Sequence, residues 1–336
     1  MIKFLAAASP AALQAALSGF ARTATVEAEY GDECVEGSAL TMAHHGPRAG
    51  GKAPCAYTNE DCVLAGVPDR DCYCGGSGVA VDGGVCRCAR REWDAVGLSH
   101  IDLDSLGGCA AILGLKPEAP AFWALAEFVD LRGPHRLSES GASAEDVARL
   151  HAFWAWSQSH RVQVPREGHA DATDAVLAGV EAIRRICADD PEMLAAGAAH
   201  AAGEAALNAE SFVKVEGGVI LRRSPQFVNH LYAAPDGTPA AAVVALNEST
   251  GAVTVSFADQ PPPGGAVAIV QGLWGSLAGG HLGIAGSPRG RAMTMGDAED
   301  AFVATMVRLG RDVCVYCRRD TTGARDSFDC CHCGGN

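Results

Sequence analysis

The stretch GLSHIDLDSLGGCAAILG, residues 97–114, decides the fold class of this chain. Residues 94–101, DAVGLSHI, form a short apolar run bounded by turn signals, which predicts a buried strand. SLGGCAAILG predicts the start of a packed helix. Asp102 and Asp104 therefore follow the carboxyl end of a strand, where open α/β sheets bind ligands. Their carboxylates suit one hard cation, and the alternative is that they cap the helix N-terminus.

Length, composition and charge indicate a folded globular protein. The chain has 336 residues, enough for two domains and a sizeable core, and it is 48% hydrophobic. A net charge of −14 is unfavourable for binding long nucleic acid over a broad surface. It still allows a small phosphorylated ligand to be held by metals and a few arginines. No uninterrupted apolar run approaches the about 20 residues of a membrane span. We expect a cytoplasmic protein with no membrane partner.

The N-terminal residues 1–24 have two interpretations. One Lys, an Ala-rich stretch and small residues near the end are typical of a signal peptide. Pro10 and Gln14 interrupt that apolar run, however, and the apolar positions at 11, 13, 16, 17 and 20 suit an amphipathic helix. We therefore predict the helix.

The remaining pattern predicts an α/β protein with several parts. Strand-like runs occupy residues 24–45, an Ala-rich helical stretch occupies 170–212, and β-type runs separated by turns follow residue 213. The predicted parts are a parallel-sheet metal-binding domain at 1–165 with a Cys-rich insert at about 50–92, a helical connector at 166–212, a smaller β-rich α/β domain at 213–310, and a zinc-binding tail at 311–336.

Two further segments carry candidate ligands. LTMAHHGPR places His44 and His45 at the exit of a β-type run, and imidazole binds Mn, Zn or Fe well. FVDLRGPHR, which we interpret as a helix or strand entering a polar loop, adds Asp130 as a third carboxylate, predicted at a strand end, and Arg132 as a phosphate contact. The alternatives are a surface histidine pair and an ordinary turn with solvated charges.

The glycine-rich segment 275–290, GSLAGGHLGIAGSPRG, is the most specific local string. Gly279 and Gly280 before His281 allow a ligand to approach the backbone closely. Successive N–H groups, with Arg289 downstream, suit an anion. This loop is therefore a candidate substrate-binding element.

Eleven of the 14 cysteines fall in two clusters, at 55–88 and 314–333. Two C-x2-C pairs separated by twelve residues have zinc-ribbon spacing. A hairpin carrying two C-x-C pairs would form a second zinc site, with disulfides as the alternative. The ligands are predicted to be Cys314, Cys317, Cys330 and Cys333 in the tail, and Cys72, Cys74, Cys86 and Cys88 in the insert. Cys331 and His332 are alternatives for the fourth tail ligand, and the nearby Cys55 and Cys62 leave the connectivity of the insert open.

The C-terminal segments GAVTVSFAD, GLWGSLAGGHLGIAGSPRG and DAFVATMVRL resemble the DHH-associated C-terminal domain of the DHH phosphoesterases. HIDLDSLGG looks like that family's Asp-x-Asp motif, and FVDLRG looks like its isolated-Asp motif. The resemblance covers roughly residues 93–310. It implies a hydrolase that cleaves a nucleotide or short oligonucleotide with Mn²⁺ or a similar ion. The implied catalytic and metal-binding residues are His100, Asp102, Asp104, Asp130, His44 and His45.

The chain departs from that family at its namesake motif. No Asp-His-His follows the Asp-x-Asp; instead AHHG precedes it, with Ala43 where Asp would stand. A permuted order of strands would bring His44 and His45 to the same site. The alternative function is a catalytically inactive DHH-like adaptor that binds nucleic acid or protein through its zinc modules. Either form is compatible with a homodimer.

Overall fold

The computed structural model describes residues 2–62, 93–165 and 167–314, together with Thr322 and the backbone of residues 64–65 and 90–91. The chain divides into two compact units, Met1–Ala201 and Ala202–Asn336. Both contain helices and sheets, and the first contains a parallel sheet, in agreement with the predicted fold class. Within the described residues, every helix is too short or too polar to span a membrane. Of the predicted zinc ligands, only Cys314 lies within the described residues, where it is buried.

The first unit is built on a five-stranded sheet in the order β5-β2-β8-β1-β9. Its strands are β1 (Lys3–Ala6), β2 (Thr23–Val26), β5 (Leu40–Met42), β8 (Ala95–Leu98) and β9 (Ala170–Asp171). All are parallel except β9, which runs antiparallel to β1. β8 is inserted between β1 and β2, so the carboxyl ends of β2, β5 and β8 meet at one edge.

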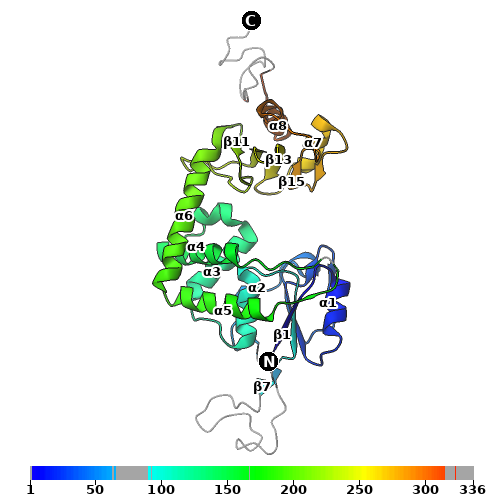
Figure 1. The fold of residues 1–336 in the computed structure, drawn as a ribbon, viewed down its shortest axis with the longest axis vertical. Helices are drawn as coiled ribbons and strands as arrows, with labels where there is room; N and C mark the ends of the chain where they lie inside the picture. Colours follow the sequence, from blue (N-terminus) through cyan, green and yellow to red (C-terminus); the bar gives the residue numbers. More distant parts are fainter. Residues whose placement is uncertain are drawn as a thin grey trace, which may run out of the picture. The chain divides into compact units, whose positions relative to one another are not determined.

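Helices cover both faces of this sheet (Figure 1). α1 (Pro10–Leu17) packs on one face, where Leu5 of β1 joins its core. The neighbouring Phe4 points to the other face, because side chains alternate along a strand. That larger core is formed with α2 (Leu103–Leu113), α3 (Pro120–Arg132), α4 (Ala144–Ser159) and α5 (Thr173–Cys187). The pattern predicted α1 but not β1, which precedes it.

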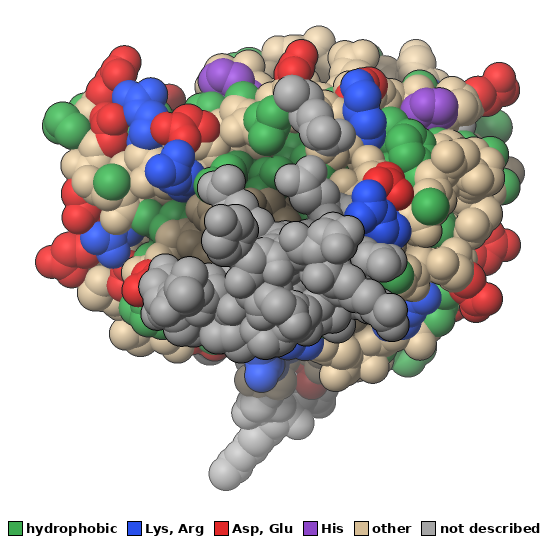
Figure 2. All heavy atoms as spheres, turned by 90° about the horizontal axis from the view of Figure 1, so that it is seen from below, with side chains coloured by type: hydrophobic (Ala, Val, Ile, Leu, Met, Phe, Trp, Pro, Cys, Tyr) green, Lys and Arg blue, Asp and Glu red, His purple; other side chains and the backbone are tan. Residues whose placement is uncertain are grey.

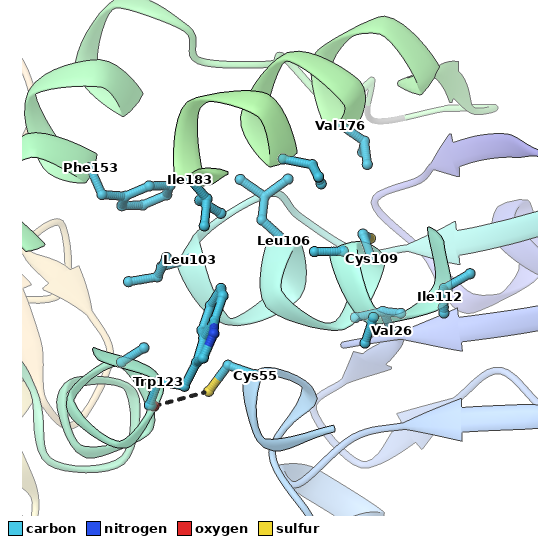
Figure 3. Close-up of a cluster of buried hydrophobic side chains, with 14 of the residues drawn as sticks. Val26, Cys55, Leu103, Leu106, Cys109, Ile112, Trp123, Phe153, Val176 and Ile183 are labelled. Carbon is cyan, nitrogen blue, oxygen red and sulfur yellow. Dashed lines mark hydrogen bonds between the residues drawn. The ribbon is translucent and has the colours of Figure 1, made fainter. Parts of the chain in front are cut away.

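The helix predicted after the opening strand is α2, and it lies at the centre of this core (Figure 3). It begins after Asp102 and ends at Gly114, which has a φ of 69°. A Cβ on Gly107 would lie 2.8 Å from the Cα of Cys55. Glycine at this position therefore allows the short helix η2 (Pro54–Ala56) to pack directly on α2.

The segment FVDLRG is helical. It forms the last turns of α3, and Gly133 ends the helix with a φ of 84°. The prediction that Asp130 follows a strand is therefore wrong, because residues 120–132 form one continuous helix that begins at a proline. The remaining elements of this unit are β3 (Glu29–Tyr30), β4 (Glu33–Cys34), η1 (Gly46–Arg48), β6 (Leu64–Ala65), β7 (Arg90–Arg91) and η4 (Pro134–Glu139).

The second unit has a six-stranded sheet in the order β10-β11-β12-β13-β15-β14. Only the β11–β12 pairing is parallel among these described strands. Two helices, α7 (Gly265–Trp274) and α8 (Met295–Arg308), pack on one face. α6 (Pro191–Ser211) leads into the strands β10 (Phe212–Glu216), β11 (Val219–Ser224), β12 (Ala242–Asn247), β13 (Ala252–Phe257), β14 (Gly279–Gly280) and β15 (Ile284–Gly286).

Charged side chains of both signs are interspersed on the face of the molecule in Figure 2. Such mixing is typical of a solvated surface. Where its side chains are described, this face differs from the continuous positive surface that long nucleic acids require.

Candidate metal centre

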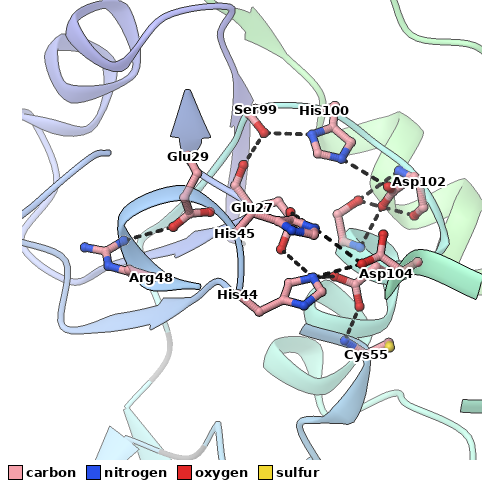
Figure 4. Close-up of polar contacts among 12 residues, drawn as sticks. Glu27, Glu29, His44, His45, Arg48, Cys55, Ser99, His100, Asp102 and Asp104 are labelled. Carbon is pink, nitrogen blue, oxygen red and sulfur yellow. Dashed lines mark hydrogen bonds and ion pairs between the residues drawn. The ribbon is translucent and has the colours of Figure 1, made fainter. Parts of the chain in front are cut away.

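Five polar side chains converge at the carboxyl edge of the first sheet (Figure 4). Glu27 follows β2, and His44 and His45 follow β5. Asp104 lies in the first turn of α2, which leaves β8, and Asp130 lies in the last turn of α3. The parallel strands bring these residues together although they are far apart in the sequence.

His44 is the common member of this cluster. Its Nε2 lies 2.9 Å from Asp130 Oδ2 and 3.5 Å from Asp104 Oδ2. The same atom lies 3.4 Å from Glu27 Oε1. His45 Nε2 lies 3.3 Å from Asp130 Oδ2 and 3.8 Å from Glu27 Oε2. Within each of two groups, Glu27–His44–His45 and His44–Asp104–Asp130, the ligand atoms all lie within 4.8 Å of one another.

Four of these ligand atoms are buried and lack a hydrogen-bond partner within the described part of the chain: Glu27 Oε1, His44 Nε2, Asp104 Oδ2 and Asp130 Oδ2. A buried polar atom without a partner costs about 1–3 kcal/mol. These atoms face one another, and a cation between them would satisfy several at once. The cluster is therefore a group of side chains that could hold a metal ion, and its mixed oxygen and imidazole donors suit Mn, Fe or Zn.

Crowding and burial perturb the carboxylates of this centre. Burial, reinforced by the negative charge of Asp104, raises the pKa of Glu27 to about 8. Burial also raises the pKa of Asp104, although bonds from Cys55 oppose the shift. The backbone of Glu27 has a φ of 49°, which residues other than glycine rarely adopt. This conformation costs on the order of 1–3 kcal/mol. A bound cation would compensate the repulsion between these charges.

Asp104 is oriented by the loop that packs on its own helix. The backbone N–H of Cys55 donates a 2.8 Å hydrogen bond to Asp104 Oδ1. That bond leaves Oδ2 directed at His44 (Figure 4). Gly107 makes it possible, because any larger side chain there would collide with Cys55. The glycines after the Asp-x-Asp motif thus position a candidate ligand.

Asp102 has a different role. It is the N-cap of α2, and its Oδ1 accepts a 2.9 Å hydrogen bond from the backbone N–H of Ser105. Its Oδ2 lies 3.0 Å from His100 Nε2, and His100 Nδ1 lies 2.7 Å from Ser99 Oγ. Neither Asp102 nor His100 belongs to the two metal-ligand groups found among the described residues. The two interpretations of this motif are a metal ligand and a helix cap. Asp102 caps the helix, and Asp104 belongs to a group that could hold a metal ion.

The bond between His100 and Asp102 shifts the pKa of both groups. It raises the pKa of His100 to about 8. Burial alone would raise the pKa of Asp102, but the bonds from His100 and Ser105 outweigh it and hold that pKa below its usual value. Ser99 donates its hydroxyl to the carbonyl of Glu27, which ties the end of β8 to the end of β2.

The predicted substrate-binding residues are not members of the two metal-ligand groups. Arg132 is the exposed last residue of α3, and it forms no ion pair with another described residue. Gly279 and Gly280 form β14 in the second unit, where an exposed hairpin also presents His281. The His281 N–H donates a 2.7 Å hydrogen bond to the carbonyl of Ile284 and closes that hairpin. Arg289 is exposed downstream of it.

Sequence reasoning missed Glu27 as a member of the centre. The signal was present, because Glu27 directly follows the apolar end of a predicted strand in TATVEAEY. The rule that identified Asp102 and Asp104 at the end of β8 applies equally to the end of β2. Sequence reasoning also missed Cys55. This residue contributes only its backbone N–H, so its residue type gives no signal of the role.

Comparisons with protein-family models, with curated proteins and with solved structures give no match to this chain.

Proposed function

We propose that the first unit is a metal-dependent phosphoric ester hydrolase that acts on a nucleotide or a short oligonucleotide, with Mn²⁺ or a similar divalent ion. One observation carries the proposal: four buried ligand atoms without hydrogen-bond partners among the described residues converge at the carboxyl edge of a parallel sheet. Binding sites of open α/β sheets are found at that edge. The DHH-like motifs around Asp104 and Asp130 agree with this chemistry.

The donor set fits such an ion. Glu27, Asp104 and Asp130 supply oxygens, and His44 and His45 supply imidazole nitrogens. When bound, a divalent ion lowers the pKa of a coordinated water and neutralises charge on the phosphate. The protein's own contribution is positional, because holding ligands and substrate in a fixed geometry accelerates the reaction of an ester.

The residues around the ligands provide that rigidity. The Cys55 amide orients Asp104, and the chain of bonds from Ser99 through His100 to Asp102 fixes the turn between β8 and α2. We assign His100 and Asp102 a positioning role in this centre. Arg132, exposed two residues after Asp130, is the candidate cation for a phosphate oxygen.

The glycine hairpin of the second unit is proposed to bind a phosphate group. The exposed residues Gly279, Gly280 and His281 present a backbone turn, and Arg289 adds a positive charge that is unpaired within the described residues. Such a turn suits a phosphate group. The tail and the insert are proposed to bind zinc on the strength of their cysteine spacing alone, and all their ligands except Cys314 lie outside the described residues.

The test combines metal analysis with a hydrolysis screen. Nucleotides, short oligonucleotides and an aryl phosphodiester are incubated with the full-length protein in Mn²⁺ or in EDTA. We expect Mn²⁺-dependent hydrolysis that Asp104→Asn and Asp130→Asn abolish, whereas Asp32→Asn, a change at an exposed carboxylate of the same unit, leaves it intact. A protein that holds zinc but neither binds Mn²⁺ nor hydrolyses any ester would refute the proposal and favour the adaptor function.

A further inference from the structure

A pocket of about 610 Å³ adjoins the metal centre in the first unit. Asp102, Asp104 and Asp130 line one part of it. The rest of the wall comes from the apolar side of α2 and α3 and from the end of α4 with the residues that follow. Its size falls within the range of small-molecule sites, about 300–1,000 Å³. The carboxylates of the centre thus border a cavity large enough for a substrate.

Aromatic side chains of one helix supply much of this wall. Phe153 is buried in the core, whereas Trp154 and Trp156 remain only partly buried and line the pocket. The Trp156 ring already stacks on the imidazole of His160, with ring centres 4.5 Å apart and an angle of 12° between the planes. Flat rings with accessible surface stack well on flat ligands. The wall thus carries partly buried aromatic rings, which are the side chains that stack on planar groups.

One cation completes the lining. Arg161 follows α4 at the pocket wall, is exposed, and forms no ion pair with any residue that the structure describes. Other described arginines do have acidic neighbours, as Arg149 has in Asp146 and Asp189. An unpaired guanidinium in a substrate-sized cavity is complementary to an anion, and its fork geometry matches phosphate oxygens.

We propose that this pocket binds the organic part of the substrate, and that this part is a nucleobase of a nucleotide. The inference rests on the proposed function, because it places the phosphate at the metal centre. The base stacks on the indole of Trp156, next to Trp154, and Arg161 adds positive charge for the phosphate. Selection of the substrate by its base then resides in the first unit, at residues distinct from the glycine hairpin of the second.

The test measures binding as well as turnover. Quenching of tryptophan fluorescence and calorimetry compare adenosine 5′-monophosphate with ribose 5-phosphate and inorganic phosphate on the full-length protein, with and without Mn²⁺. Base stacking contributes about 1–3 kcal/mol, so the nucleotide should bind about 5- to 150-fold more tightly than ribose 5-phosphate. Equal affinities for the two would overturn the proposal.

Variants separate stacking from charge. Trp156→Leu keeps an apolar wall but removes the ring, so it should erase the preference for the nucleotide, whereas Trp156→Phe should retain most of it. Arg161→Gln should lower the affinities for the nucleotide and for ribose 5-phosphate by a similar factor. Arg184→Gln, at an exposed arginine of α5, should change neither affinity. Melting temperatures confirm that each variant is folded.

The outcomes show separately whether the base subsite and whether the hydrolase activity exist. If the wild type hydrolyses esters with and without a base equally well, and Trp156→Leu changes neither kcat nor KM, the subsite is refuted while the hydrolase stands. If the nucleotide binds with its preference intact but no ester is cleaved, the hydrolase is refuted and the subsite stands. Tighter binding of an alkyl phosphate than of the nucleotide would also refute a base site.

Discussion

The backbone amide of Cys55 donates a 2.8 Å hydrogen bond to one oxygen of Asp104, and the other oxygen of that carboxylate lies 3.5 Å from the Nε2 of His44. A loop residue thus determines which oxygen of a candidate ligand faces the centre. The contact depends on how closely η2 packs on α2, and Gly107 sets that distance. Residues that hydrogen-bond to metal ligands and orient them contribute strongly to metal affinity.

Replacing Gly107 with alanine should therefore weaken metal binding from a distance. The added methyl would lie 2.8 Å from the Cα and Cβ of Cys55 and would push η2 away from α2. We expect a lower melting temperature and an affinity for Mn²⁺ reduced about 10- to 100-fold, as for other residues that support ligands. Calorimetric titration with Mn²⁺ measures the effect. Gly203→Ala, in a helix where the added methyl would meet nothing within 4 Å beyond the helix's own backbone, is the control and should bind Mn²⁺ normally. Equal affinities in both variants would contradict the role of Gly107.

The two aspartates of the Asp-x-Asp motif should give opposite stability profiles. Asp104→Asn removes a buried charge beside other carboxylates, so without metal the fold should be at least as stable, while stabilisation by Mn²⁺ is lost. Asp102→Ala removes the N-cap of α2 and should cost about 0.5–2 kcal/mol. That variant should still be stabilised by Mn²⁺. Urea unfolding with Mn²⁺ or EDTA measures both profiles, and a stronger loss of Mn²⁺ stabilisation in Asp102→Ala would reverse the assignment.

Local pattern predicted much of this site because strand ends can be recognised from the sequence. The apolar run before His100 predicted β8, the glycine-containing run predicted α2, and the exit of a β-type run identified His44 and His45. Each signal lies within a few residues of the side chain concerned. The strand order that brings them together is set by long-range packing, which no local pattern encodes.

The choice between Asp102 and Asp104 shows the limit of such reasoning. Both residues stand where a helix cap or a ligand is expected, and the spacing fits either role for each. The decision comes from Cys55, which is distant in sequence and binds Asp104 through its backbone. Asp130 was misplaced for a similar reason, since an apolar run with a charged end fits a buried strand or a helix equally well.

The stability of the metal-free protein should fall as the pH rises from 5 to 8. Burial raises the pKa of Glu27 to about 8, so the folded state holds a proton that the unfolded chain, with a pKa of 4.5, has lost. The stabilisation is complete below the unfolded value and is lost as the pH rises through the folded one. The slope should reach at most about 1.4 kcal/mol per pH unit.

Melting temperatures in EDTA across this pH range measure that trend. Glu27→Gln cannot ionise and should flatten the curve, whereas Glu36→Gln, at an exposed position, should not. Excess Mn²⁺ should oppose the trend, because metal binding displaces protons from its ligands and is favoured at higher pH. Metal-free stability that increases steadily from pH 5 to 8 would show that Glu27 does not retain its proton.

The second unit contains a fully buried guanidinium that pairs with no carboxylate among the described residues. Arg222 of β11 donates five hydrogen bonds of 2.6–3.0 Å to oxygens of Asn208, Ser211, Leu231 and Ala233. Two of these partners end α6, and the other two belong to the segment that precedes β12. Burial lowers the pKa of Arg222 to about 10. One side chain thus connects the sheet to both segments.

Replacing Arg222 with lysine should destabilise this unit by at least about 2 kcal/mol, because an ammonium has three donors, cannot reproduce the planar fork, and leaves buried oxygens without partners. Arg223→Lys is the matched control. Arg223 is exposed beside Arg222 in the same strand and pairs only with Glu248 among the described residues, a contact worth less than about 1 kcal/mol.

Urea unfolding followed by circular dichroism measures both variants in the full chain. Arg222 and the metal centre lie in different units, so if two transitions are seen, the one that shifts in Arg222→Lys should be the one that Mn²⁺ does not stabilise. If the two variants unfold at the same urea concentration, the five hydrogen bonds contribute no more than a surface ion pair.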